Sequence, residues 1–279
     1  MCFTDESSLM NKIEQPQNCR IALGVEYDGS HYSGWQMQSH GTRTVQHEIE
    51  KALSIVADHA VRVVCAGRTD TGVHATGQVV HFDSHAERKT KAWVMGVNTH
   101  LPDDVCVHWA RQVTEDFSAR FSATMRRYRY VILQRTARPA LYSHRVTWVH
   151  NDLNTRAMHE AAKALLGAND FSSFRSSACQ SEHAMRIIKS IDVTAEGAFV
   201  YIDIQANAFL HHMVRNIVGS LLKVGTGERP LAWMGELLAL KDRTRAGPTA
   251  PAQGLYLVAV QYPDEYDLPA SGSVPRFDG

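Results

Sequence analysis

The chain has 279 residues, 44% of them apolar and 21% charged, which is typical of a globular protein with a sizeable core and excludes a disordered or fibrous chain. The 29 basic and 29 acidic residues cancel, so the net charge does not indicate a nucleic-acid partner. No apolar run approaches a membrane span, and the first residues lack the apolar core of a signal peptide. The five cysteines are scattered without a CxxC pair, as free thiols are in a reducing compartment. We therefore expect a cytoplasmic protein with no membrane partner.

The first part of the chain alternates strand and helix patterns. Residues 44–58 are expected to form a helix, because apolar residues recur there at helical spacing after a candidate N-cap at Thr44. The recurring residues are Val45, Ile49, Leu53 and Val56. The other elements expected before residue 115 are strands at 20–29, 61–69, 77–83 and 105–113 and a helix at 89–101.

The second part repeats this pattern. Residues 187–207 are expected to form a hairpin that turns at Glu196 and Gly197. The remaining expected elements are strands at 124–133 and 254–262 and helices at 153–168, 211–225 and 231–242. Hairpins interleaved with helices indicate an α+β fold, with a mixed and mainly antiparallel central sheet flanked by helices.

The pattern divides the chain near residue 115 into two similar subdomains. A cleft between two such halves is a natural place for a functional site. The expected parts are a flexible N-terminal tail at 1–19, an N-terminal subdomain at 20–115, a C-terminal subdomain at 116–262 and a C-terminal tail at 263–279.

Positive charge is concentrated in one segment. Between Arg111 and Arg145 the chain carries eight arginines and only two acidic residues, Glu115 and Asp116. A neutral total therefore hides a basic region, and the field over one face is the relevant quantity for a polyanionic partner.

The stretch "CAGRTDTGVHATGQVVHF", residues 65–82, places an aspartate between two expected strands. Arg68 and Asp70 have the same parity along an extended segment and should point to the same side. An arginine within reach favours the ionised carboxylate, as a nucleophile or base requires. Three glycines, Gly67, Gly72 and Gly77, suggest that another group closely approaches this backbone.

Three alternatives compete with a catalytic Asp70. The Asp-Thr-Gly sequence is good turn chemistry by itself. It is also a signature of aspartic proteases, but their chemistry needs a second aspartate and no neighbouring positive charge. Fifteen histidines suggest a metal, yet no HExxH occurs, and we expect the adjacent His211 and His212 to point in different directions on a helix, so no metal site is predicted.

The motif "AGRTDTGVHATGQVVHF" resembles the catalytic motif of pseudouridine synthases, and among them the tRNA pseudouridine synthase A family. The similarity covers roughly residues 20 to 268, with several long motifs in the same order. The supporting motifs are "EYDGSHYSGWQ" (26–36), "FSARFSATMRRYRYVI" (117–132), "NDFSSFR" (169–175), "ANAFLHHMVRNIVGSL" (206–221) and "GLYLVAV" (254–260).

The resemblance implies an isomerase that converts uridine to pseudouridine in tRNA without a cofactor. It places the essential aspartate at Asp70 and the arginine that pairs with it at Arg215. The tyrosine that lies against the target base corresponds to Tyr128, and Leu255 is expected to line the same pocket. Arg68 corresponds to a residue that fills the space left by the extruded nucleotide.

The implied substrate is the anticodon arm of tRNA, at positions 38, 39 and/or 40. Uridines in paired stem must be extruded before reaction, and a stem is bound through its phosphates and shape. The resemblance also implies a homodimer. A non-catalytic RNA-binding protein of the same fold is the alternative. The expected RNA contacts are Arg68, Arg88, Phe117, Ser118, Ala119, Arg120, Phe121 and Arg126, with weaker candidates at 178–182.

Overall fold

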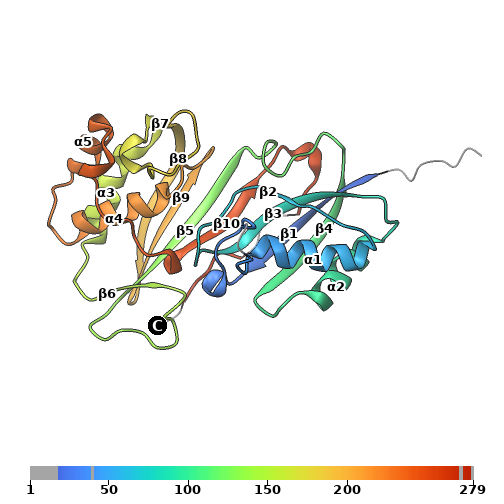
Figure 1. The fold of residues 1–279 in the computed structure, drawn as a ribbon. Coiled ribbons are helices and arrows are strands. Elements are labelled where there is room, and N and C mark those ends of the chain that lie inside the picture. Colours follow the sequence, from blue (N-terminus) through green and yellow to red (C-terminus); the bar gives the residue numbers. More distant parts are fainter. Residues whose placement is uncertain (1–17, 39–40, 270–272, 278–279) are drawn as a thin grey trace, which may run out of the picture.

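The computed structural model describes residues 18–38, 41–269 and 273–277, and these form ten strands and five α-helices (Figure 1). No helix among them has the length and apolar character needed to cross a membrane. The strands are β1 (Cys19–Tyr27), β2 (Val64–Cys65), β3 (His74–Ser84), β4 (Val105–Val113), β5 (Met125–Gln134), β6 (Thr147–Val149), β7 (Gly167–Asp170), β8 (Met185–Glu196), β9 (Phe199–Ala206) and β10 (Leu255–Gln261). The helices are α1 (Val45–Ala57), α2 (Thr90–His100), α3 (Thr155–Ala162), α4 (Met213–Gly225) and α5 (Trp233–Leu240).

One sheet runs through both halves of the described chain, in the order β4-β1-β3-β10-β5-β9-β8-β7, with β2 paired to β3 and β6 to β5. The β3–β10 and β5–β6 pairs are parallel and the others antiparallel. The predicted α+β fold with a mixed, mainly antiparallel sheet is therefore confirmed. Strand β10 lies between β3 and β5, so the last of the described strands joins the two halves.

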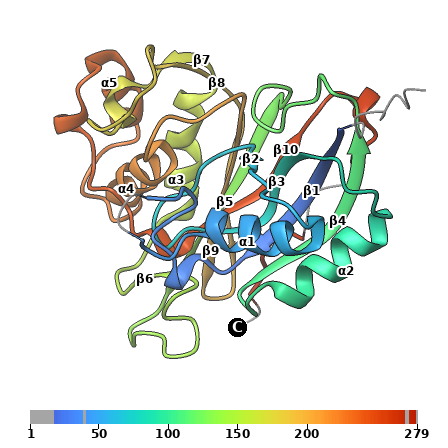
Figure 2. The same ribbon diagram turned by 45° about the vertical axis from the view of Figure 1, so that its right-hand side comes forward.

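The two sides of the central strands belong to different apolar clusters. Tyr130 of β5 and Leu257 of β10 belong to the main core, which also contains the buried faces of the helices. Their neighbours Val131 and Val258 point to the opposite side, as strand alternation requires. Helices α1 and α2 cover the N-terminal half, and α3, α4 and α5 gather on the C-terminal half (Figure 2).

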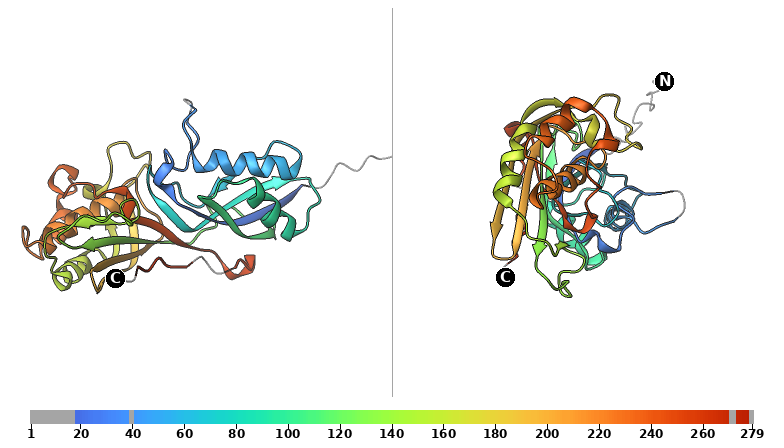
Figure 3. Two further views of the ribbon diagram at one scale, coloured as in Figure 1. Left: turned by 90° about the horizontal axis from the view of Figure 1, so that it is seen from below. Right: turned by 90° about the vertical axis from the view of Figure 1, so that its left-hand side faces the viewer.

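The described part of the expected C-terminal tail packs on the sheet. Phe277 contacts the rings of Phe199 and Tyr256, and Arg129 donates to the Pro275 carbonyl at 3.0 Å. This segment runs along the side of the sheet opposite to α1 (Figure 3, left). It therefore covers the second apolar cluster, on the side of the sheet that α1 does not occupy.

Two local expectations are wrong, and a third is confirmed in position only. The strand expected at 61–69 is reduced to Val64 and Cys65, because the chain then leaves the sheet to form the Asp70 loop. The helix expected at 153–168 ends at Ala162 and gives way to a short 3-10 turn and β7. Thr44 is the N-cap residue of α1, but its side chain makes no capping hydrogen bond.

Candidate active site

A cleft of about 1270 Å³ lies where the two halves meet, and Asp70 lines it. One wall comes from the loops around Trp35 and Asp70, and the other from the segment that precedes α4. The described residues that line it include five arginines and one acidic residue. The arginines are Arg68, Arg120, Arg126, Arg186 and Arg215, and the acid is Asp70. The cleft therefore attracts polyanions around a single carboxylate.

The loop that carries Asp70 is fixed through its neighbour Thr69. The Thr69 carbonyl accepts from Trp35 N–H at 3.0 Å, and its hydroxyl lies 2.8 Å from the Tyr27 hydroxyl. Val73 N–H donates to the Asp70 carbonyl at 3.1 Å and closes the turn. Thr69 is buried, whereas Arg68 is exposed and Asp70 half-buried. Arg68 and Asp70 both line the cleft, on the side that their parity indicated.

Glycines let other segments approach this loop. Gly34 has φ +89, and a Cβ there would lie 2.9 Å from the Thr69 carbonyl oxygen. A Cβ on Gly77 would lie 2.3 Å from the Val258 carbonyl oxygen. The close neighbour that the sequence suggested is thus strand β10 at Gly77, and no ligand is needed to explain that glycine. At Gly67, by contrast, a Cβ would lie 3.7 Å from the Tyr128 hydroxyl, which is an ordinary van der Waals distance.

Arg215 of α4 pairs with Asp70. Its Nη1 donates to Asp70 Oδ2 at 3.0 Å, and its Nε donates to the Ala250 carbonyl at 2.8 Å. The Arg215 side chain is 15% exposed and that of Asp70 22%. A pair so little exposed is screened less than a surface pair, so the arginine both orients the carboxylate and stabilises its charge.

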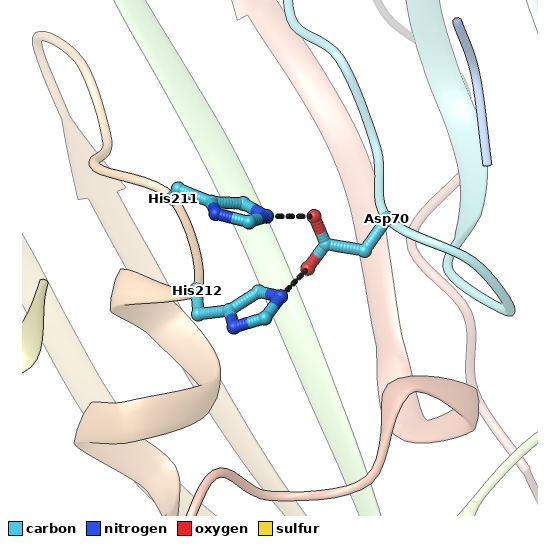
Figure 4. Close-up of side chains that lie close together, drawn as sticks. All are labelled: Asp70, His211 and His212. Carbon is cyan, nitrogen blue, oxygen red and sulfur yellow. Dashed lines mark ion pairs between the residues drawn. The ribbon is translucent and has the colours of Figure 1, made fainter. Parts of the chain in front are cut away.

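Two histidines also face the same carboxylate (Figure 4). His211 Nε2 lies 3.3 Å from Asp70 Oδ1, and His212 Nε2 lies 3.3 Å from Asp70 Oδ2. The expectation that these side chains diverge on a helix is wrong, because both residues precede α4 and His212 adopts a left-handed conformation with φ 62. The adjacent apolar run made this segment look like uninterrupted helix.

The ligand atoms of Asp70, His211 and His212 all lie within 4.8 Å of one another, which is close enough for a divalent transition metal. Arg215, however, already supplies a positive charge to this carboxylate at 3.0 Å. The Asp70 carboxylate therefore already has a cationic partner in Arg215, with two imidazole rings 3.3 Å from its oxygens.

Tyr128 and Leu255 line the cleft beside Asp70. Tyr128 is buried and packs edge-on against Phe209, with ring centroids 5.0 Å apart. Burial raises the pKa of Tyr128 above its usual value, and the negative charge of Asp70 adds a smaller increase. The Tyr128 hydroxyl therefore stays protonated at neutral pH. Phe209 was not singled out from the sequence, where it sits in an apolar run like any core residue.

Five of the eight candidate RNA contacts divide into two groups. Arg68, Arg120 and Phe121 are exposed at the cleft, and the Arg120 guanidinium lies over the Phe121 ring at 5.1 Å. Residues 178–181 also line it. Phe117 and Ala119, by contrast, are fully buried, so their side chains belong to the core and offer no surface to RNA.

The remaining three candidates, Arg126, Ser118 and Arg88, are not exposed residues of the cleft. Arg126 donates to the carbonyls of residues 66, 120, 123 and 207, so it links these backbone segments within the cleft wall. Burial lowers the pKa of Arg126, in keeping with this structural position. Ser118 is half-buried and accepts from Phe121 N–H at 3.3 Å. Arg88 is exposed beside the end of α1, and it does not line the cleft.

Comparison with known proteins decides the family. The sequence profile described as tRNA pseudouridine synthase matches residues 24–122 and 161–263, which is more than half of the chain and includes Asp70 and Arg215. The chain belongs to the tRNA pseudouridine synthase family.

Curated relatives of this synthase family match nearly the whole chain. A tRNA pseudouridine synthase A of Klebsiella pneumoniae is 57% identical over 96% of this chain and 99% of its own length. The protein of that name from Escherichia coli O1:K1 is 56% identical with the same coverage. A solved H/ACA RNP with a substrate RNA aligns over 72% of this chain and 44% of its own at 13% identity, and its TM-score of 0.35 is too low to support an argument.

Proposed function

We propose that this synthase isomerises uridine to pseudouridine in the anticodon arm of tRNA, at positions 38, 39 and/or 40, with Asp70 as the essential carboxylate. The observation that carries the proposal is the position of Asp70: the one acid among the described cleft residues, paired with Arg215 beside Tyr128. The identity to curated tRNA pseudouridine synthases supports the same reaction.

The site has the groups that this isomerisation needs. The N1–C1′ bond breaks, the uracil turns, a C5–C1′ bond forms, the C5 proton is lost to water, and N1 takes up a proton in its place. The reaction exchanges no electrons with another molecule, so side chains can perform it without a cofactor. Asp70 meets the ribose, and Tyr128 provides an aromatic surface for the detached base. The buried side chains of Tyr128 and Leu255 form the part of the cleft wall that limits the access of water to the intermediate.

The direct test is to map pseudouridine in tRNA from cells with and without the gene. Loss of pseudouridine from the anticodon arm alone supports the proposal. Its retention there, or its loss from another RNA only, would refute the assigned substrate. Tritium release from tRNA labelled at uridine C5 gives the matching assay with purified protein, since the reaction expels that hydrogen.

The exposed pair Arg120 and Phe121 is expected to bind the RNA. Replacement of Arg120 by alanine should weaken tRNA binding several-fold. It should also reduce the slope of log binding constant against log salt concentration by the amount of about one phosphate contact. Phe121→Ala should weaken it further if the ring stacks on a base. Filter binding over a series of salt concentrations measures both effects. Arg88→Ala, an exposed arginine outside the cleft, is the matched control and should leave affinity within about twofold.

Tyr128 is expected to act through its ring more than through its hydroxyl. Base stacking is worth about 1–3 kcal/mol, so Tyr128→Leu should lower kcat/KM roughly 5- to 150-fold relative to Tyr128→Phe. Tyr128→Phe should remain within about tenfold of the unchanged protein. Tritium-release kinetics separate the two variants. Equal activity of the leucine and phenylalanine variants would exclude stacking at this position.

The assembly and location complete the proposal. We infer a homodimer from the family likeness, so light scattering should give twice the mass of one chain. We also place the protein in the cytoplasm. The free thiols of Cys65, Cys106 and Cys179 fit a reducing compartment.

A further inference from the structure

The oxygens of Asp70 are not equivalent. Oδ2 lies within reach of two donors, Arg215 Nη1 at 3.0 Å and His212 Nε2 at 3.3 Å. Oδ1 faces His211 Nε2 at 3.3 Å. Because each carboxylate oxygen offers about two lone pairs, Oδ2 has a polar neighbour for each of its lone pairs, whereas Oδ1 has one such neighbour and keeps a lone pair for another partner.

The backbone around the two histidines is held in an unusual conformation. His212 has φ 62 and ψ 5, in the left-handed region that non-glycine residues rarely adopt. Ser176 N–H donates to the His211 carbonyl at 3.1 Å, and Asn216 N–H donates to the His212 carbonyl at 2.9 Å. His211 N–H lies 3.5 Å from Cys179 Sγ. The loop before α4 and the first turn of α4 thus impose a conformation that turns both rings toward Asp70.

We propose that His211 and His212 are positioning residues that hold the Asp70 carboxylate with Oδ2 anchored and Oδ1 turned toward the ribose. This inference rests on the proposed function, because it assigns a task to residues around the reactive aspartate. Each histidine presents its Nε2 to one oxygen of the carboxylate, and Arg215 supplies the compensating positive charge. The carboxylate thus remains a competent nucleophile or base.

The electrostatics of His212 agree with a neutral donor. Burial lowers the pKa of His212 from its ordinary value of 6.5, and the nearby Asp70 opposes this effect. His211, Arg215 and Arg243 also disfavour its protonation. His212 is therefore neutral at pH 7 and gains a proton only below its ordinary range. A proton there adds a second positive charge beside Asp70 and weakens the carboxylate as a nucleophile or base.

The test uses two substitutions of His212 with opposite expectations. His212→Gly relieves the left-handed strain but removes the ring, so it should melt at or above the temperature of the unchanged protein while kcat falls about tenfold to hundredfold. Its KM for tRNA should change less than about threefold. His212→Gln keeps a donor of similar reach and does not titrate. It should retain most of kcat at pH 7 and shift the acid limb of the pH profile to lower pH.

Two further variants complete the experiment. His211→Ala should lower kcat without weakening tRNA binding. His108→Ala is the matched control, because His108 is similarly exposed and lies 3.1 Å from Glu26 on strands outside this cleft. It should leave both kcat and the pH profile unchanged.

The outcomes separate this inference from the proposed function. An unchanged kcat in both His212→Gly and His211→Ala, with Asp70→Asn inactive, would overturn the positioning role alone. An active Asp70→Asn would overturn the assigned site itself. A parallel loss of kcat and melting temperature in His212→Gly would mean that the histidine serves the fold and not the carboxylate.

Discussion

Asp70→Asn is expected to abolish pseudouridine formation, lowering the single-turnover rate by at least about a thousandfold. Asparagine keeps the size of the side chain and removes the negative charge that must meet the ribose. The loop should remain in place, because its anchors are the Thr69 backbone and hydroxyl and the Asp70 carbonyl. Binding of tRNA should therefore stay within roughly tenfold. Tritium release and filter binding measure the two quantities.

The matched control for this variant is Asp83→Asn. Asp83 is also paired with an arginine, Arg20, at 2.7 Å, but it lies at the end of β3 and does not line the cleft. It should keep full activity. Substantial activity in Asp70→Asn would show that the essential group lies elsewhere.

Arg215→Gln is expected to lower kcat/KM about tenfold to hundredfold, since a hydrogen bond to a charged group is worth about 1.5–3 kcal/mol. Arg215 bridges Asp70 and the Ala250 carbonyl, and glutamine cannot serve both. Arg215→Lys should restore little of this activity, because a lysine ammonium cannot donate to two separate acceptors in the way that the Nε and Nη1 atoms of a guanidinium do. Steady-state kinetics and thermal melting should be measured together.

Lys223→Gln is the control on the same helix. Lys223 forms an exposed pair with Glu228 at 2.6 Å, and pairs of this kind contribute at most about 1 kcal/mol. It should change neither activity nor melting temperature appreciably. Full activity of Arg215→Gln would contradict the role given to the Asp70–Arg215 pair.

Local sequence patterns predicted most elements because these elements bury one face. In α4, Met213, Ile217, Leu221 and Val224 recur at helical spacing, and all four are buried. Strand β4 occupies the expected residues 105–113. Strands β6 and β7 were missed, since short pieces of three or four residues leave no periodic signal.

Contacts between distant segments were harder to predict. The pairing of Asp70 with Arg215 spans 145 residues and followed from family resemblance, although the cost of an unpaired arginine in an apolar run also indicated an acidic partner. The orientation of the His211 and His212 side chains was predicted wrongly, because the left-handed conformation occurs at a histidine and not at a glycine, which would have indicated it. Burial of Phe117 and Ala119 depends on packing against β3 and the C-terminal segment, which the 117–121 motif does not encode.

The structure of the Asp70→Asn protein with a tRNA bound tests the central claim most directly. We expect a uridine of the anticodon arm to be extruded into the cleft, with its C1′ about 3–3.5 Å from the residue 70 side chain and its base against Tyr128. A bound tRNA whose uridines all remain stacked, or whose extruded base lies away from residue 70, would contradict the account.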